Sequence, residues 1–288
     1  MFPLLAKRGV AWLEARKVYA PWKGRRPEKF DYNLLVIGAG SAGLVSAYIA
    51  AAVKAKVALI ERDKMGGDCL NTGCVPSKAL LRSAKFLAQA RRATELGIKA
   101  VQVDVSFRDL MNRVQRVIKT VEPHDSVERY TELGVDCVQG EARITSPWTV
   151  EITTPDGIRT LSARSLVIAA GARPFVPPIP GLEDVGYLTS DTVWGLQERP
   201  QRLVVLGGGP IGCELAQAFA RIGSRVTQVE MLPRLMVRED PEVSETVMRR
   251  FRDEGIDVRI ETKALSCTVE AGEKVLMAEH AGEQVRTP

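Results

Sequence analysis

The sequence of 288 residues predicts an α/β fold built on two βαβ units. The glycine spacing G-x-G-x-x-G occurs twice, and each copy directly follows an apolar run that is typical of a buried parallel strand. Each copy is followed by a helical pattern, a second strand-like run and a glutamate. One such fingerprint alone is a weak signal, but two copies in this context predict two nucleotide-binding units.

The first unit begins with the apolar run at residues 34–37, and a helical pattern follows at residues 44–53. Its first glycine permits a tight turn, its second lets a pyrophosphate approach the backbone, and its third lets helix and strand pack closely. The helix N-terminus then binds the anion. A second strand at residues 57–60 ends in a glutamate whose carboxylate we expect to accept hydrogen bonds from a ribose. The residues expected to contact this nucleotide are Gly38, Gly40, Ser41, Ala42, Gly43, Glu61 and Arg62.

A membrane-spanning helix is the rival interpretation of this region. Residues 32–53 contain no charged side chain and are long enough to cross a bilayer. Three glycines, one asparagine and two serines make them a poor membrane helix. The second copy of the pattern also favours the βαβ interpretation.

The second unit repeats the pattern with strands at residues 203–206 and 226–229 and a helix at residues 213–222. Its closing acid, Glu230, favours the free 2′-hydroxyl of NAD and repels the 2′-phosphate of NADP. Arg234 lies four residues further on and could soften this preference, so NAD is the preferred cofactor rather than the exclusive one. The residues expected to contact this nucleotide are Gly207, Gly209, Pro210, Ile211, Gly212 and Glu230.

Two cysteines, Cys69 and Cys74, lie between the two units. A regular helix would separate their Cα atoms by roughly 8.5 Å, whereas a disulfide needs about 7 Å or less. A distorted first turn would close the pair, because Gly73 adds backbone freedom and Pro76 and Ser77 are suited to starting a helix. Cys74 would then lie near a helix N-terminus, where partial positive charge favours the thiolate.

Other chemistry for these cysteines is weaker. A zinc site would need more ligands, and the only two histidines, His124 and His280, are not in zinc-ligand spacing, so we expect no metal. A structural disulfide is disfavoured because no secretory signal precedes the pair and the closed loop is short. A reversible redox pair is the better interpretation. The remaining three cysteines are expected to be small buried side chains: Cys137, Cys213 and Cys267.

These motifs resemble those of the flavoprotein disulfide reductases, which include dihydrolipoamide dehydrogenase, glutathione reductase and mercuric reductase. The resemblance covers residues 31–288 and is most specific from Gly66 to Lys78, where the chain is similar to the mercuric-reductase-like and dihydrolipoamide-dehydrogenase-like members. It implies that the first unit binds FAD and the second binds NAD(P)H. Electrons would pass from NAD(P)H through FAD to the Cys69–Cys74 disulfide, and on to a disulfide, lipoyl-type or mercuric acceptor.

The resemblance also implies roles for single residues. Cys74 matches the thiol next to the flavin, and Cys69 matches the interchange thiol that meets the substrate. Lys78 matches a lysine near the reactive flavin nitrogen, and Glu214 matches its acidic partner in a low-dielectric site; without the motif, Lys78 would be a surface lysine on an amphipathic helix. Further cofactor contacts are implied for Gly67, Asp68, Lys78, Ala170 and Gly171.

Two departures from the family pattern bear on these roles. Pro210 stands where some relatives carry a tyrosine that covers the flavin, so we expect a more open nicotinamide pocket. Asp68 stands where a threonine is common, and its charge should oppose thiolate formation at Cys69.

The resulting fold prediction is two Rossmann-like FAD/NAD(P)-binding βαβ domains with β-meander insertions, the second incomplete. Residues 1–30 form a basic segment, residues 31–180 the FAD-binding domain with the redox disulfide, and residues 181–288 the incomplete NAD(P)-binding domain. A hairpin is expected around residues 148–161, and a β-meander after Glu261. The family's C-terminal dimerisation domain, with its histidine and glutamate pair, is expected to be missing from a truncated chain, although the full-length family forms homodimers.

The first thirty residues contain eight basic and two acidic residues, a net charge of +6, whereas the whole chain carries +5. They could form an amphipathic helix on an anionic membrane surface, and a solvated basic tail explains them equally well. Nucleic-acid binding has little support. The cysteine usage, with no signal peptide and no credible membrane span, favours the cytoplasm, at the membrane face if the segment binds there, and a role in cell redox homeostasis.

An alternative function stays open from the sequence. The chain could be a nucleotide-binding remnant without turnover that acts as a regulatory or membrane-associated module. An enzyme needs a flavin that nicotinamide can reduce, whereas a remnant does not.

Overall fold

The computed structural model of the protein describes residues 20–288 except residues 23 and 100. Contacts divide the chain into two compact units. The first contains the chain up to Asn71 together with Val121–Ala172, and the second contains Thr72–Thr120 together with Arg173–Pro288. Most of the expected amphipathic helix in residues 1–30 lies outside the described residues.

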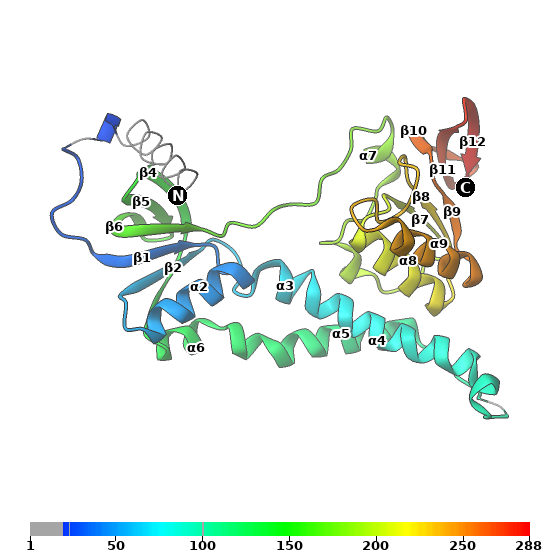
Figure 1. The fold of residues 1–288 in the computed structure, drawn as a ribbon, viewed down its shortest axis with the longest axis horizontal. Helices are drawn as coiled ribbons and strands as arrows, with labels where there is room; N and C mark the ends of the chain where they lie inside the picture. Colours follow the sequence, from blue (N-terminus) through cyan, green and yellow to red (C-terminus); the bar gives the residue numbers. More distant parts are fainter. Residues whose placement is uncertain (1–19, 23, 100) are drawn as a thin grey trace, which may run out of the picture. The chain divides into compact units, whose positions relative to one another are not determined.

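The first unit contains a six-stranded sheet with the order β3-β2-β1-β6-β5-β4 (Figure 1). β1, β2, β3 and the end of β6 are parallel, whereas β4, β5 and the start of β6 are antiparallel. The strands are β1 Tyr32–Ile37, β2 Val57–Glu61, β3 Val135–Gln139, β4 Glu141–Ser146, β5 Thr149–Thr154 and β6 Gly157–Ile168. The expected hairpin is confirmed, and β4 extends it to a three-stranded meander.

Helices of the first unit are η1 Ala20–Trp22, α2 Ser41–Ala52, α3 Gly67–Asn71, η3 Glu122–Asp125 and α6 Val127–Glu132. The uncharged residues 32–53 are therefore divided between β1 and α2, as the βαβ interpretation predicts. One sheet face packs on α2 and α6 through residues such as Leu59 and Tyr130, and the other packs on the meander through residues such as Ile60 and Ile152. Within the described residues, no helix is long and apolar enough to cross a membrane.

The second unit contains the parallel sheet β7 Arg202–Leu206, β8 Arg225–Val229 and β9 Asp257–Arg259, in that order. Its helices are α4 Cys74–Arg91, η2 Ala93–Leu96, α5 Phe107–Val121, α7 Leu182–Val185, η4 Val193–Gly195, α8 Pro210–Ile222 and α9 Pro241–Asp253. The predicted second βαβ unit is confirmed as β7, α8 and β8, with the helix starting three residues earlier than expected, at Pro210.

Residues 72–120 share a core with the second unit because α4 and α5 pack with α8. Leu80, Met111 and Phe219 are all buried in this core, and the rings of Phe107 and Phe219 lie 6.2 Å apart. The boundaries of the compact units therefore differ from those of the domains expected at residues 31–180 and 181–288. The assignment of FAD and NAD(P) binding to those two domains stays a prediction.

The meander expected after Glu261 is also present, as β10 Thr262–Glu270, β11 Glu273–His280 and β12 Glu283–Thr287. Ala271-Gly272 and Ala281-Gly282 connect its strands, and all four residues have positive φ, as a type I′ hairpin turn requires. Cys267 joins this sheet to the preceding loop, because its N–H donates to the carbonyl of Pro180 at 2.8 Å.

An ion-pair network ties α8 to the end of α9. Arg221 donates from Nε and Nη2 to the two carboxylate oxygens of Glu254 at 2.8 and 2.7 Å, and Arg250 adds a bond from Nε at 2.7 Å. The side chains of Arg221 and Glu254 are only 16% and 13% exposed. Burial alone would raise the pKa of Glu254, but the bonds and charges of the two arginines outweigh burial and lower it.

We expect Glu254→Gln to lower the free energy of unfolding near neutral pH by roughly 1 to 3 kcal/mol, because it weakens charge-assisted bonds. The pKa of Glu254 is lower in the folded protein than the ordinary value of 4.5. The ionised carboxylate therefore stabilises the fold above pH 4.5, and this stabilisation is lost as the pH falls through the pKa of the folded state. Urea unfolding across this pH range measures the effect. The control is Glu245→Gln, at an exposed position of α9, which should lose stability with falling pH as the wild type does. If Glu254→Gln also showed the wild-type loss of stability at acid pH, the assignment would be contradicted.

Candidate functional site

The first glycine turn connects β1 to α2 and is held by close backbone packing. Gly38 has φ +100°, and a Cβ there would lie 2.3 Å from the carbonyl oxygen of Ala169. A Cβ on Gly43 would lie 1.8 Å from the oxygen of Gly38, so helix and strand approach as closely as the fingerprint predicts. A Cβ on Gly40 would meet nothing nearer than 3.9 Å, so space remains beside the second glycine.

Both nucleotide turns present an uncapped helix start. Gly40 is the N-cap of α2 and Gly209 is the N-cap of α8, and neither has a side chain that could accept from the first-turn N–H groups. These donors are therefore available to an anion, which the helix dipole also favours. The backbone fits the pyrophosphate of a dinucleotide in both units.

Two glutamates, at the ends of β2 and β8, hold the glycine turns through hydrogen bonds to backbone N–H groups. Glu61 accepts from the backbone N–H of Ala39 at 2.6 Å and of Asp63 at 2.8 Å. Glu230 accepts from Gly208 N–H at 2.6 Å and from Leu232 N–H at 2.8 Å. We call this arrangement the carboxylate clamp.

The clamp is a role that the sequence analysis missed. The expected ribose bonds of these glutamates stay a prediction, and a carboxylate that accepts two N–H bonds still has lone pairs for hydroxyl donors. A signal was present in the sequence, because both units place the acid 22 residues after the residue between the first two glycines.

The second glycine turn also receives hydrogen bonds from buried side chains of β8 and α8. Gln228 is fully buried, and its Nε2 donates to the carbonyl of Gly207 at 3.0 Å. The thiol of Cys213 lies 3.4 Å from the carbonyl oxygen of Gly208. The peptide between Gly207 and Gly208 is therefore held by Gln228 on its oxygen and by Glu230 on its nitrogen.

Holding the turn in this way places polar groups in the core, which is unfavourable when they lack hydrogen-bond partners. The Oε1 of Gln228 is buried and has no hydrogen-bond partner among the described residues. Burial also raises the pKa of the Cys213 thiol. In the first unit, Leu59 and Leu44 occupy the corresponding positions relative to the glycines and the glutamate.

Arg234 does not lie free beside the clamp of the second unit. Its Nη2 donates to the carbonyls of Val237 and Glu239 at 2.9 and 3.3 Å. These bonds hold the guanidinium on its own loop.

The cysteine motif starts against the first glycine turn. Gly66 donates from its N–H to the carbonyl of Ala39 at 2.9 Å, and a Cβ on Gly67 would lie 2.6 Å from the Cα of Gly40. Gly66 and Gly67 have φ of +84° and +51°, which favours glycine at both positions. Cys69 follows on the short helix α3 and is partly buried. The first cysteine is thereby placed next to the first nucleotide turn.

The second cysteine begins α4 in the second unit. Cys74 is an exposed thiol outside any disulfide, and Gly73 is the N-cap with φ −114° and ψ −105°. Ser77 closes the first turn, because its N–H donates to the carbonyl of Gly73 at 3.0 Å. The expectation of a helix start at this cysteine is confirmed.

Lys78 lies one turn further along α4 and reaches Glu214, the fifth residue of α8. Its Nζ is 2.5 Å from Oε1 of Glu214, so the predicted partners meet. The expected low-dielectric setting is not found, because the side chains are 61% and 40% exposed. An ion pair as exposed as this one contributes only about 0 to 1 kcal/mol to stability.

Two further residues position the second cysteine and were not expected from the sequence. The buried indole of Trp194 donates from Nε1 to the carbonyls of Thr72 and Ser190, both at 2.7 Å. Arg113 on α5 donates to the carbonyl of Ala79 at 2.8 Å. Trp194 lies on the short helix η4 and Arg113 on the long helix α5, and such residues usually indicate only packing or a surface, so no local signal pointed to these bonds.

The remaining residues named in the sequence analysis differ in how far they are exposed to solvent. Cys213 and Cys267 are buried as expected, and Cys137 is partly buried on β3, where burial raises its pKa. His124 and His280 are exposed. The predicted cofactor contacts that are open to solvent are Ser41, Ala42, Arg62, Asp68, Lys78, Ala170, Gly171, Gly207, Gly209, Pro210 and Ile211.

Comparison with known proteins places this geometry in a family. The family model described as pyridine nucleotide-disulphide oxidoreductase matches residues 32–287. The chain is 37% identical over 228 residues to a mercuric reductase of Lysinibacillus sphaericus, covering 79% of this chain and 41% of that one. It is 37% identical over 238 residues to a dihydrolipoyl dehydrogenase of Chlorobaculum parvum, covering 81% of this chain and 50% of that one.

A solved structure agrees with these relatives. The HOCl-induced flavoprotein disulfide reductase RclA of Escherichia coli superposes with a TM-score of 0.71 at 26% identity, covering 88% of this chain and 54% of that one. The chain thus spans about half the length, or less, of the proteins it matches. From the family model, the curated relatives and the shared fold, the chain belongs to the pyridine nucleotide-disulphide oxidoreductases, a family that uses FAD and NAD(P)H.

Proposed function

We propose that this chain forms the nucleotide-binding part of an FAD-dependent oxidoreductase that takes electrons from NAD(P)H and passes them to the Cys69 and Cys74 pair. The observation that carries the proposal is the Lys78–Glu214 ion pair. It joins the helix that begins with Cys74 to the helix that begins at the second glycine turn. A cysteine of redox type is thus coupled to a nucleotide turn inside one compact unit.

The first unit would hold FAD. Its open second glycine, its uncapped helix start and the Glu61 clamp suit a dinucleotide, and the cysteine motif packs directly on this turn through Gly67. When bound, FAD supplies two-electron exchange between reduced nicotinamide and a disulfide. The disulfide takes up two electrons and two protons, its S–S bond breaks, and two thiols form.

The second unit would hold NAD in preference to NADP. Its clamp carboxylate, Glu230, would repel a 2′-phosphate, and Arg234 is already bonded to its own loop. A guanidinium held in this way has fewer donors left for a phosphate. These contacts support NAD more firmly than the sequence alone does.

The final acceptor would be a disulfide, a lipoyl-type group or mercuric ion. This range follows from the curated relatives, which include mercuric reductases and dihydrolipoyl dehydrogenases. We also propose that the protein acts as a homodimer, as the resemblance to the full-length family implies.

Anaerobic titration of the flavin-loaded protein with NADH and with NADPH tests this function. We expect more than one hydride equivalent per flavin, a long-wavelength absorbance band from a thiolate next to the flavin, and reduction by NADH at lower concentration than by NADPH. Cys69→Ser should keep the band, and Cys74→Ser should abolish it. Cys137→Ser, a partly buried thiol on β3, is the control and should behave as the wild type.

Failure of NADH and NADPH to reduce the bound flavin would contradict the proposal and favour a nucleotide-binding remnant. Loss of the band in Cys69→Ser but not in Cys74→Ser would reverse the roles of the two cysteines.

Lys78→Met should slow flavin reduction more than Lys78→Arg, because only the arginine keeps a charge that can pair with Glu214. Since the pair is exposed, both variants should melt close to the wild type. Anaerobic stopped-flow reduction by NADH, together with thermal unfolding, separates catalysis from stability. Unchanged reduction rates in both variants would rule out this role for Lys78.

Gln228→Leu should weaken NADH binding roughly three- to ten-fold, because the peptide between Gly207 and Gly208 loses the bond to its oxygen. The variant should still fold, since leucine occupies the matching position in the first unit and removes a buried oxygen without a partner. Titration of NADH and thermal unfolding give the two readouts.

The control for this variant is Val226→Ala on the same strand, a buried position without a bond to the turn. It should lower the melting temperature and leave NADH affinity unchanged. Equal NADH affinity in Gln228→Leu and the wild type would show that Gln228 does not position the turn.

A further inference from the structure

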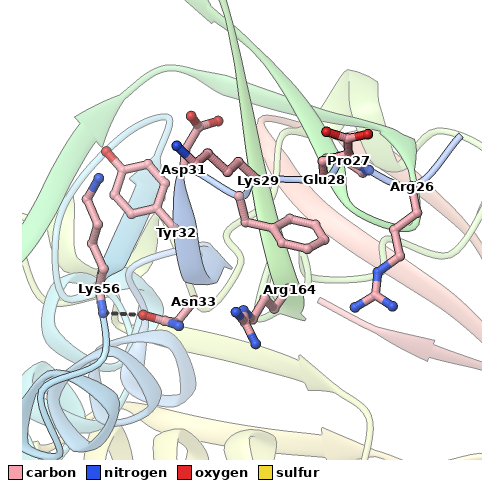
Figure 2. Close-up of a pocket in the computed structure, with 10 residues that line it drawn as sticks. Arg26, Pro27, Glu28, Lys29, Asp31, Tyr32, Asn33, Lys56 and Arg164 are labelled. Atoms are coloured by element: carbon pink, nitrogen blue, oxygen red, sulfur yellow. Dashed lines mark hydrogen bonds between the residues drawn. The ribbon is translucent and has the colours of Figure 1, made fainter.

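A pocket of about 590 Å³ lies at the start of β1 and β2 in the first unit (Figure 2). Its lining includes four basic side chains, Arg26, Lys29, Lys56 and Arg164. Arg26 and Lys29 precede β1, Lys56 directly precedes β2, and Arg164 belongs to β6. The glycine turn and Glu61 lie at the other ends of β1 and β2, so this pocket is separate from the nucleotide site.

The pocket carries an excess of positive charge. Among the described residues, the acidic side chains that line it are Glu28 and Asp31. Asp31 is already engaged, because its Oδ2 accepts from the N–H and the Oγ of Ser162 at 2.8 and 2.7 Å. Within the described residues, none of the four basic side chains forms an ion pair with a carboxylate. The charge of Lys56 does act on Asp31, because it helps to lower the pKa of that carboxyl group. An anion entering the pocket would still meet four cations that are outside any ion pair of the described residues.

Aromatic rings support two of these cations. The guanidinium of Arg26 lies 5.6 Å from the centre of the Phe30 ring, and the Nζ of Lys56 lies 4.8 Å from the centre of the Tyr32 ring. Burial, together with the bond to Asp136, raises the pKa of Tyr32 to about 12, so its phenol stays neutral. In Figure 2 the guanidinium groups of Arg26 and Arg164 point in the same direction, whereas the amine of Lys56 points the opposite way.

The pocket also continues the basic N-terminal segment. Residues 1–30 carry a net charge of +6, and Arg26 and Lys29 belong to this segment. Lys56 and Arg164 come from the folded unit and add cations where the segment joins it. Just before Arg26 in the sequence, the guanidinium of Arg25 lies 5.9 Å from the centre of the ring of Trp22, a residue type that favours the membrane interface.

We propose that this pocket binds the phosphate of an anionic lipid headgroup and so brings the first unit to an anionic membrane surface. Guanidinium groups match phosphate oxygens in geometry, and clustered lysines and arginines are attracted to anionic leaflets. From the sequence, the basic segment at residues 1–30 was explained equally well by membrane binding and by a solvated tail. The pocket adds cations of the folded unit to this segment and so favours membrane binding. This inference does not depend on the proposed redox function.

Co-sedimentation of the full chain with vesicles tests the proposal at low ionic strength. We expect binding to phosphatidylcholine vesicles that contain phosphatidylglycerol and little binding to phosphatidylcholine alone. Lys56→Gln with Arg164→Gln should weaken binding roughly five-fold per residue, or about twenty-five-fold together. The control, Arg249→Gln with Arg252→Gln, removes the same charge from exposed positions of α9 and should bind as the wild type.

Three outcomes would overturn the proposal. The first is equal vesicle binding by the wild type and the Lys56 and Arg164 double variant, with folding of both verified by circular dichroism. The second is no preference of the wild type for anionic vesicles. The third is binding of inorganic phosphate, measured by calorimetry, that is as tight as vesicle binding, because that would assign the pocket to free phosphate.

Discussion

The carboxylate clamp is the constraint on which both nucleotide turns depend. A glycine-rich turn is flexible by composition, and its N–H groups can serve an anion only if the backbone stays in one conformation. Glu61 and Glu230 provide this by accepting from the residue between the first two glycines and from a residue just beyond the strand. Each carboxylate thereby connects the end of one strand to the turn that leaves the neighbouring strand.

The second turn needs more support than the first because its composition differs. It reads Gly207-Gly208-Gly209 where the first reads Gly38-Ala39-Gly40, so its middle peptide lacks the restriction that a side chain imposes. Gln228 and Cys213 supply side-chain bonds to its carbonyls, in a core where the first unit uses leucine. The buried oxygen of Gln228 is the unfavourable term that accompanies this support.

The two cysteines of the motif are attached to different parts of the structure. Cys69 follows glycines that pack on the first turn, whereas Cys74 begins a helix whose Lys78 pairs with Glu214 next to the second turn. Trp194 holds the carbonyl of Thr72, just before the second cysteine. The chain is therefore fixed by backbone packing just before Cys69 and by the Trp194 side chain just before Cys74.

The sequence by itself determined the features that are local: the two βαβ units, the glycines with close backbone contacts, the helix start at Cys74 and the meander strands. These follow from periodicity, turn chemistry and a specific motif, which need no knowledge of distant residues. Only the tertiary structure decided what the two glutamates hold, how Gln228 and Trp194 contribute, that the Lys78 and Glu214 pair is exposed, and where Lys56 and Arg164 join the basic segment. The reason is physical, because hydrogen-bond partners, burial and charge clusters are set by residues that approach one another only when the chain is folded.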